Sequence, residues 1–157
     1  MDIHEYLMEK GVKLTPSATT QYLYHDPCHS PMKQYAPVKV ASTLMGKNVL
    51  LSDRCCGEAG TFAVTRPDIA SQVRFRKEEE LKKGIEQFTG RPMAQDGNIK
   101  LLTSCPACQQ GLSRYRDETG LDTDYIVVEL ANKWLGAGWQ ERFVEGARQG
   151  GIERVLL

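Results

Sequence analysis

The sequence predicts an α/β fold: a single domain with a mostly parallel, open sheet of about four strands and helices on both faces. Short apolar runs alternate along the chain with segments whose apolar residues recur at helical spacing. Strands separated by helices favour a parallel sheet that is covered on both faces. The 157 residues are about the length of one domain, and no repeat, low-complexity tract or linker divides them. We therefore treat residues 1–157 as one cysteine-rich domain.

The predicted elements begin with a helix and a strand that precede the first cysteine. Asp2 is a candidate N-cap with Glu5 three residues later, and this capping pattern predicts a helix that Gly11 ends. His4 lies on this helix and is expected at the surface. Residues 20–24 are then predicted to form the first strand.

The middle of the chain adds a short helix, a strand and the longest helix. Pro37 suits the first turn of a helix that ends at Gly46, and the apolar residues 48–52 follow as a second strand. Near-helical spacing of apolar residues predicts the longest helix over residues 67–88. The charged residues of this helix include Arg74, Arg76, Lys77, Glu78 and Glu79. We interpret this charged run as a solvated helix face without a functional role.

The last part of the chain continues the alternation. Residues 99–103 predict a third strand, which runs into a helix that carries Leu112. Residues 125–128 predict a fourth strand, again with a helix after it. The tail after Gly138 has helical potential, and its apolar end at residues 155–157 is not assigned to an element.

Composition and charge exclude several classes of function. The chain is 41% hydrophobic and 25% charged, and its net charge is zero, so nothing in it favours nucleic acid or a membrane surface. The longest apolar runs are far too short to span a bilayer. The N-terminus has neither the basic start nor the apolar stretch of a signal peptide. We expect a soluble cytoplasmic domain with no nucleic-acid partner and no membrane insertion of its own.

Five cysteines distinguish this chain from an ordinary α/β domain. They are Cys28, Cys55, Cys56, Cys105 and Cys108. An odd number without a secretory signal is a poor disulfide framework, and a bridge within the vicinal pair would be strained. One cysteine follows the first predicted strand, two follow the second and two follow the third. Because the ends of parallel strands meet at one edge of a sheet, where such folds hold ligands, we expect all five thiols to share one site.

The local sequence around these cysteines suits a metal or redox centre. Cys105 and Cys108 open a predicted helix, whose N-terminus favours thiolate, and their spacing lets both sulfurs face one ion. Gly57 and Gly60 would let the backbone turn sharply and approach a cluster closely. Taken alone, the C-x-x-C motif is also compatible with a dithiol redox pair, and Cys28 with a small buried hydrophobic residue.

Two histidines flank Cys28, and three roles are open to them. His25 and His29 are metal ligands, hydrogen-bond donors to the site, or residues that cap the strand end and pack beside it. The residues alone favour the packing role.

The motifs, taken in order, resemble a known family. They are YHDPCH at residues 24–29, CCGEAG at residues 55–60 and SCPAC at residues 104–108. This series is similar to the cysteine-rich CCG domain that occurs in heterodisulfide reductase, in the glycolate oxidase iron–sulfur subunit and in anaerobic glycerol-3-phosphate dehydrogenase. It also looks like the C-terminal part of large FAD-linked oxidases of the 2-hydroxy-acid type. The resemblance extends from the first helix to Trp134.

The resemblance implies electron transfer between a flavin site and a quinone, disulfide or other acceptor. The five cysteines would be the ligands of an iron–sulfur cluster, which in heterodisulfide reductase is a non-cubane 4Fe-4S cluster, and zinc is the alternative. Gly57 and Gly60 would shape the loop at the cluster, and His25 and His29 would tune it. The expected partners are a flavin-containing dehydrogenase domain or subunit, which carries FAD, and a ferredoxin-type domain. Through such a partner the chain would be peripheral to a membrane.

Because relatives commonly carry two copies of the motif, we interpret the chain as a domain excised from a longer protein. We expect it to be an electron-transfer part of an oxidoreductase rather than a complete enzyme. Two other functions stay open: a structural zinc module of a larger enzyme, although five thiols are one more than zinc needs, and a thiol–disulfide redox domain that uses Cys105 and Cys108.

Overall fold

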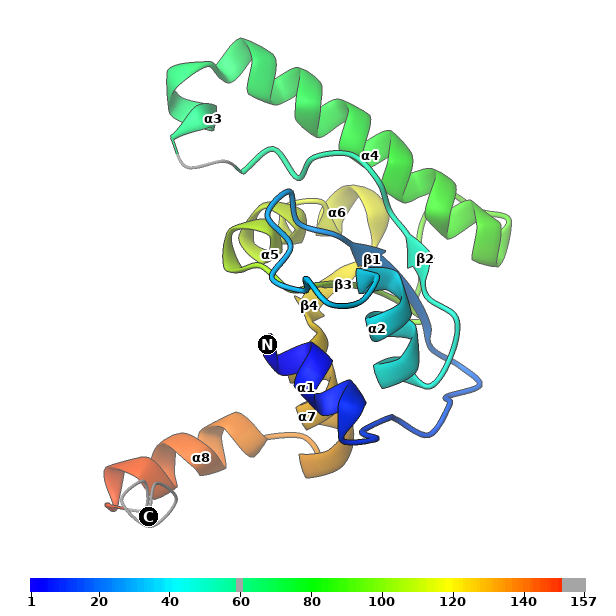
Figure 1. Cartoon of the computed structure of the whole chain (residues 1–157). Coiled ribbons are helices and arrows are strands. Elements are labelled where there is room, and N and C mark those ends of the chain that lie inside the picture. The colour runs from blue at the N-terminus through cyan, green and yellow to red at the C-terminus, as the bar shows by residue number, and fades with distance from the viewer. Residues whose placement is uncertain (59–60, 151–157) are drawn as a thin grey trace.

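A four-stranded parallel sheet forms the centre of the molecule (Figure 1). Strands β1 (Gln21–His25) and β3 (Ile99–Thr103) are its inner strands, and β2 (Leu50–Leu51) and β4 (Asp122–Tyr125) are its edges. The strand order is β2-β1-β3-β4, and each neighbouring pair runs parallel. This computed structural model describes residues 1–58 and 61–150. The predicted fold class, a parallel α/β sheet of about four strands, is confirmed.

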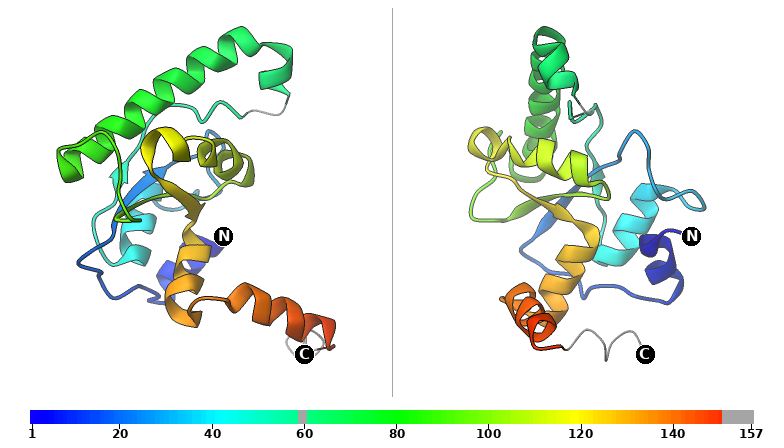
Figure 2. Two further views of the ribbon diagram at one scale, coloured as in Figure 1. Left: turned by 180° about the vertical axis from the view of Figure 1, so that it is seen from behind. Right: turned by 90° about the vertical axis from the view of Figure 1, so that its left-hand side faces the viewer.

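Helices cover both faces of the sheet, as the sequence predicts (Figure 2). In the described part of the chain they are α1 (Ile3–Glu9), α2 (Pro37–Met45), α3 (Phe62–Thr65), α4 (Pro67–Thr89), α5 (Pro106–Ser113), α6 (Arg116–Thr119), α7 (Ile126–Leu135) and α8 (Trp139–Arg148). Helices α1, α2 and α7 lie on one face, and α4, α5 and α6 lie on the other. Among the described helices, none combines the length and the apolar character that crossing a membrane requires.

Two hydrophobic cores result, one on each face of the sheet. Tyr22, Tyr24 and Leu102 point into the core shared with α2 and α7. Leu23 and Leu101 point to the opposite side, into the core shared with α4 and α5. This follows from the alternation of side chains along a strand. Since both faces of β1 and β3 are covered, these strands are almost continuously apolar, which is why the sequence located each of them to within one residue.

The fourth predicted strand is wrong. Residues 122–125 form β4, and Ile126 begins α7 instead of continuing a strand through residue 128. Ile126 and Leu130 are one helical turn apart and both are buried in the core beneath α2, so packing overrides the strand preference of the β-branched run. The true strand contains Asp122 and Asp124 and is only half-buried, so it gives no apolar signal.

The predicted capping box at the N-terminus is confirmed. The Asp2 side chain accepts a hydrogen bond from the main-chain N–H of His4 at 2.9 Å, and the Glu5 carboxylate accepts one from the main-chain N–H of Asp2. The expectation that His4 lies at the surface is wrong, because its ring folds back against the cap and is buried, with Nδ1 2.6 Å from Asp2 Oδ1. Glu5 is also buried and accepts a hydrogen bond from the main-chain N–H of Gln34, which joins α1 to the loop after β1.

Candidate metal centre

The three cysteine groups follow the carboxyl ends of three adjacent strands. Strand β1 ends at His25, β2 at Leu51 and β3 at Thr103, and all three strands point in the same direction. The loops that follow them surround one cavity of about 200 Å³. Its lining is Pro27, Cys28, His29, Cys55, Cys56, Glu58, Cys105, Ala107 and Cys108. The structure therefore brings all five thiols to one place, and their role as metal ligands stays a prediction.

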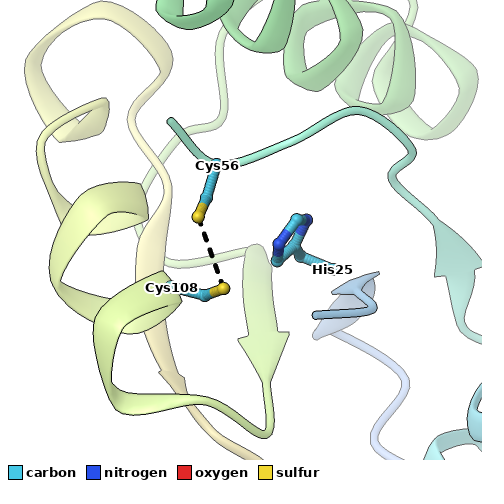
Figure 3. A group of neighbouring side chains, drawn as sticks. All are labelled: His25, Cys56 and Cys108. Carbon is cyan, nitrogen blue, oxygen red and sulfur yellow. Dashed lines mark hydrogen bonds between the residues drawn. The ribbon is translucent and has the colours of Figure 1, made fainter. Parts of the chain in front are cut away.

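Two sulfurs lie deepest in this cavity and touch each other (Figure 3). Cys56 and Cys108 are both buried, and their Sγ atoms are 3.3 Å apart. The hydrogen bond with Cys108 lowers the pKa of Cys56 to about 4, against the opposing effect of burial, and the His25 ring and the N–H of Glu58 lower it further. The same hydrogen bond, together with burial, raises the pKa of Cys108. One thiolate and one thiol therefore share this position.

This distribution of charge differs from the one expected at the start of the helix. Cys105 is the N-cap of α5, and Cys108 lies in its first turn, where the helix dipole favours thiolate. The thiolate nevertheless belongs to Cys56, because the hydrogen bond between the two sulfurs lowers the pKa of Cys56 and raises that of Cys108. The contact between the loop after β2 and helix α5 thus outweighs the local effect of the helix end.

The remaining cysteines lie nearer to solvent. Cys28 and Cys55 are exposed, and Cys105 is half-buried. The Sγ atom of Cys55 accepts a hydrogen bond from the N–H of Gly57 at 3.4 Å, but partial desolvation of this thiol raises its pKa. The cavity therefore has a buried end formed by Cys56 and Cys108 and a rim at which thiols meet water.

The glycine turn after the vicinal cysteines is present. Gly57 has φ +79°, a left-handed conformation that favours glycine. A Cβ atom at this position would also lie 3.3 Å from Cγ of Arg74 on α4. Gly60, the second glycine expected to shape the loop, lies outside the described residues.

The two histidines occupy different parts of the site. His25 is buried at the end of β1, and one of its ring nitrogens lies within 4.8 Å of the sulfurs of Cys56 and Cys108. His29 is exposed and lines the rim of the cavity. His25 is thus placed to act on the buried sulfurs, whereas His29 faces the entrance.

An ion pair that the sequence did not reveal fixes the loop after the vicinal cysteines. Glu58 lines the cavity, and its carboxylate pairs with Arg114 through two nitrogen–oxygen contacts of 2.8 and 3.0 Å. Gly111 on α5 makes room for this loop, since a Cβ atom there would lie 2.7 Å from Cβ of Glu58. These residues are far apart in sequence, so spacing gave no signal for them.

Lys77 is the second residue that the sequence missed. The charged run of α4 was expected to form a solvated face, and for Lys77 this expectation is wrong, because its side chain is fully buried. Its Nζ donates to main-chain carbonyls of Ser52 and Asp53 and lies 3.2 Å from Nδ1 of His25. Burial lowers the pKa of Lys77 to about 8. A signal did exist, since Lys77 stands four residues before Leu81 on the buried stripe of the helix.

The donor set of the cavity fits a sulfur-ligated metal centre. Thiolate sulfur is the ligand that iron–sulfur clusters and zinc take from proteins. Five thiols and one histidine nitrogen converge here, and the cavity of about 200 Å³ leaves space between them. Cys56 is already ionised at neutral pH, the form in which cysteine binds a metal.

Comparison with known proteins agrees with a cysteine-rich site. The family model described as "Cysteine-rich domain" (CCG) matches residues 22–113, which is more than half of the chain and contains all five cysteines. A second model, a domain of unknown function (DUF3400), matches residues 113–157. No solved structure matches the chain.

Several curated proteins are similar to this chain. An uncharacterised iron–sulfur protein of Methanococcus maripaludis is 27% identical over 140 residues, 83% of this chain and 26% of that protein. The glycolate oxidase iron–sulfur subunit of Escherichia coli is 33% identical over 90 residues, 54% of this chain and 22% of that protein. A fumarate reductase (CoM/CoB) subunit of Methanothermobacter marburgensis is 26% identical over 129 residues, 77% of this chain and 24% of that protein. The chain thus spans about a quarter of the length of these relatives, and by the match over residues 22–113 it belongs to the cysteine-rich CCG domain family.

Proposed function

We propose that the chain is an iron–sulfur electron-transfer domain of a flavin-dependent dehydrogenase or reductase, of the 2-hydroxy-acid oxidase or heterodisulfide reductase type. The observation that carries this proposal is the convergence of five cysteines on one cavity at the carboxyl edge of the sheet. Relatives that are named as iron–sulfur proteins or subunits add support. The electron donor and acceptor would lie in partner domains, one with FAD and one of ferredoxin type.

In this proposal the chain supplies ligands, shielding and electrostatics. A bound iron–sulfur cluster would supply one-electron transfer. Cys56 and Cys108 would hold its buried side, and Cys28, Cys55 and Cys105 the side near the rim. The Gly57 turn brings main-chain N–H groups towards the sulfurs, where they stabilise negative charge. Because the rim thiols are exposed, a partner domain would approach the centre from that side.

A thiol–disulfide function is the second candidate, and one distance favours it. The sulfurs of Cys56 and Cys108, 3.3 Å apart, need to approach by little more than 1 Å to reach disulfide length, about 2 Å. The sequence suggested Cys105 and Cys108 for this role, whereas the structure favours Cys56 and Cys108. In the cluster-binding proposal the same two sulfurs are ligands instead.

Metal and sulfide analysis after anaerobic purification tests these functions. Iron with acid-labile sulfide, lost in Cys56→Ser and Cys108→Ser but kept in Ser113→Ala, is the expected result. Ser113 is a suitable control because it is exposed on the same helix as Cys108. Stoichiometric zinc without sulfide would instead identify a structural zinc module. A metal-free protein whose Cys56 and Cys108 form a disulfide reversibly would identify the redox domain.

A further inference from the structure

We propose that Lys77 is a positioning residue of the metal centre: it holds His25 in the tautomer whose Nε2–H donates to the buried sulfurs. This inference rests on the proposed function, since the sulfurs in question are the predicted ligands Cys56 and Cys108. It assigns His25 the role of hydrogen-bond donor and excludes it as a ligand through Nε2.

The first step is the environment of the Lys77 side chain. Lys77 is fully buried, and its Nζ lies 2.9 Å from both the carbonyl oxygen and the Oγ of Ser52, 2.5 Å from the carbonyl oxygen of Asp53 and 3.2 Å from Nδ1 of His25. A lysine ammonium has three N–H donors and no acceptor, so these four contacts share three N–H groups. A buried charge is tolerated when such partners surround it. The ammonium therefore joins α4, the end of β1 and the loop after β2.

The second step is the proton on the His25 ring. A neutral imidazole carries one N–H and one acceptor nitrogen. Because Nδ1 of His25 faces the donor-only Nζ of Lys77, Nδ1 is the acceptor, and the ring proton resides on Nε2.

The third step is the destination of that N–H group. The Nε2 atom is buried, and no described protein atom forms a hydrogen bond with it. The sulfurs of Cys56 and Cys108 are within 4.8 Å of a ring nitrogen, and the ring stands beside both of them (Figure 3). We therefore assign this N–H group to the sulfurs of the centre, and a proton on Nε2 prevents this nitrogen from binding a metal.

The electrostatic consequence concerns the reduced centre, which carries one more negative charge than the oxidised one. An N–H donor aimed at sulfur and a buried cation behind it both stabilise the added electron. Loss of the Lys77 charge should therefore shift the reduction midpoint to more negative values. Lys83→Met is the matched control, because Lys83 is an exposed lysine on the same helix.

The ring tautomer can be measured without any metal. The chain is labelled with ¹⁵N-histidine, reduced and treated with a chelator, and its ¹⁵N–¹H NMR spectrum is recorded. The signals of His25 are identified as those that are missing from the spectrum of His25→Gln. We expect Nε2–H in the wild-type chain and in Lys83→Met, and loss of this preference in Lys77→Met. Nδ1–H at His25 in the wild-type chain would overturn the inference, whether or not the lysine variant folds.

A redox titration of the chain reconstituted with iron and sulfide gives the second readout. The midpoint should become more negative in Lys77→Met, return towards the wild-type value in Lys77→Arg and remain unchanged in Lys83→Met. Equal midpoints in all four proteins would overturn the inference. If no cluster assembles, the proposed function fails, and the tautomer of the metal-free chain still decides the role of Lys77.

Discussion

At the scale of single residues, the site depends on which of two neighbouring cysteines is ionised. Cys56 comes from the loop after β2 and Cys108 from the first turn of α5, yet their 3.3 Å contact lowers the pKa of one thiol and raises that of the other. A metal that binds here displaces a proton from Cys108 but none from Cys56. The ionisation of Cys56 therefore reports whether Cys56 and Cys108 have been brought into contact.

The thiolate of Cys56 should be visible in a pH titration. Its pKa of about 4, lowered from 9.0, means that the metal-free, reduced chain holds this thiolate at neutral pH and loses it only on acidification. We expect an ultraviolet absorbance step with a midpoint near pH 4 that is absent in Cys56→Ser.

Two further variants identify the cause of the low pKa. Cys108→Ala removes the largest lowering influence, so the midpoint should move up towards 9.0. Cys28→Ala removes an exposed thiol from the rim and should leave the midpoint in place. A titration in which the wild-type chain shows no step below neutral pH would contradict the assigned thiolate.

At the scale of elements, the long helix α4 is fixed against β1 by a close approach. A Cβ atom at Gly84 would lie 2.9 Å from Cδ2 of Leu23, a side chain that is fully buried in the centre of the sheet. Since α4 also carries Lys77, the approach of this helix decides whether the lysine reaches the site. Glycine at position 84 thus serves packing rather than a turn.

Gly84→Ala should destabilise the protein. Overpacking a filled core costs about 1–3 kcal/mol, more than the gain of up to about 1 kcal/mol in helix propensity. Gly146→Ala in α8 is the matched control, because nothing lies within 4 Å of its added Cβ, and it should stabilise slightly. Free energies of unfolding from urea titrations measure both effects, and equal stabilities of the two variants would contradict the close approach.

At the scale of the whole molecule, the strand order creates the site. Strand β1 pairs with β2 on one side and with β3 on the other, so the loops after all three strands open onto the same edge. This edge of an open parallel sheet is where such folds bind ligands. A metal centre ligated from all three segments would add a further connection to those that the Cys56–Cys108 contact and the Glu58–Arg114 ion pair already make.

Metal binding should therefore stabilise the complete domain. A ligand that binds the folded state at a hundred times its Kd contributes about 2.7 kcal/mol, or a rise in Tm of about 5–10 °C for a domain of this size. Calorimetry before and after anaerobic reconstitution with iron and sulfide measures the rise. We expect it in Ser113→Ala and not in Cys108→Ser. Stoichiometric iron and sulfide without any rise would show that the centre does not connect the loops.

Strands that are buried on both faces were easier to predict from the sequence than strands that are only partly buried. Strands β1 and β3 were located well because their apolar runs are continuous, whereas β4 was missed because it is polar and half-buried. Helix α4 was predicted within one residue of its observed end, but its Lys77 was assigned to solvent. Charge alone suggested exposure there, since the partners of that lysine lie more than twenty residues away.

By itself the sequence determined the alternation of strands and helices, the positions of five thiols behind three strands, and the family to which they point. The tertiary structure alone decided that Cys56 meets Cys108, that Glu58 pairs with Arg114 and that Lys77 lies beneath His25. Secondary-structure propensity and residue spacing are local properties, so they can be determined from the sequence. Contacts between loops depend on how helices pack onto the sheet, and that packing is set by the whole fold at once.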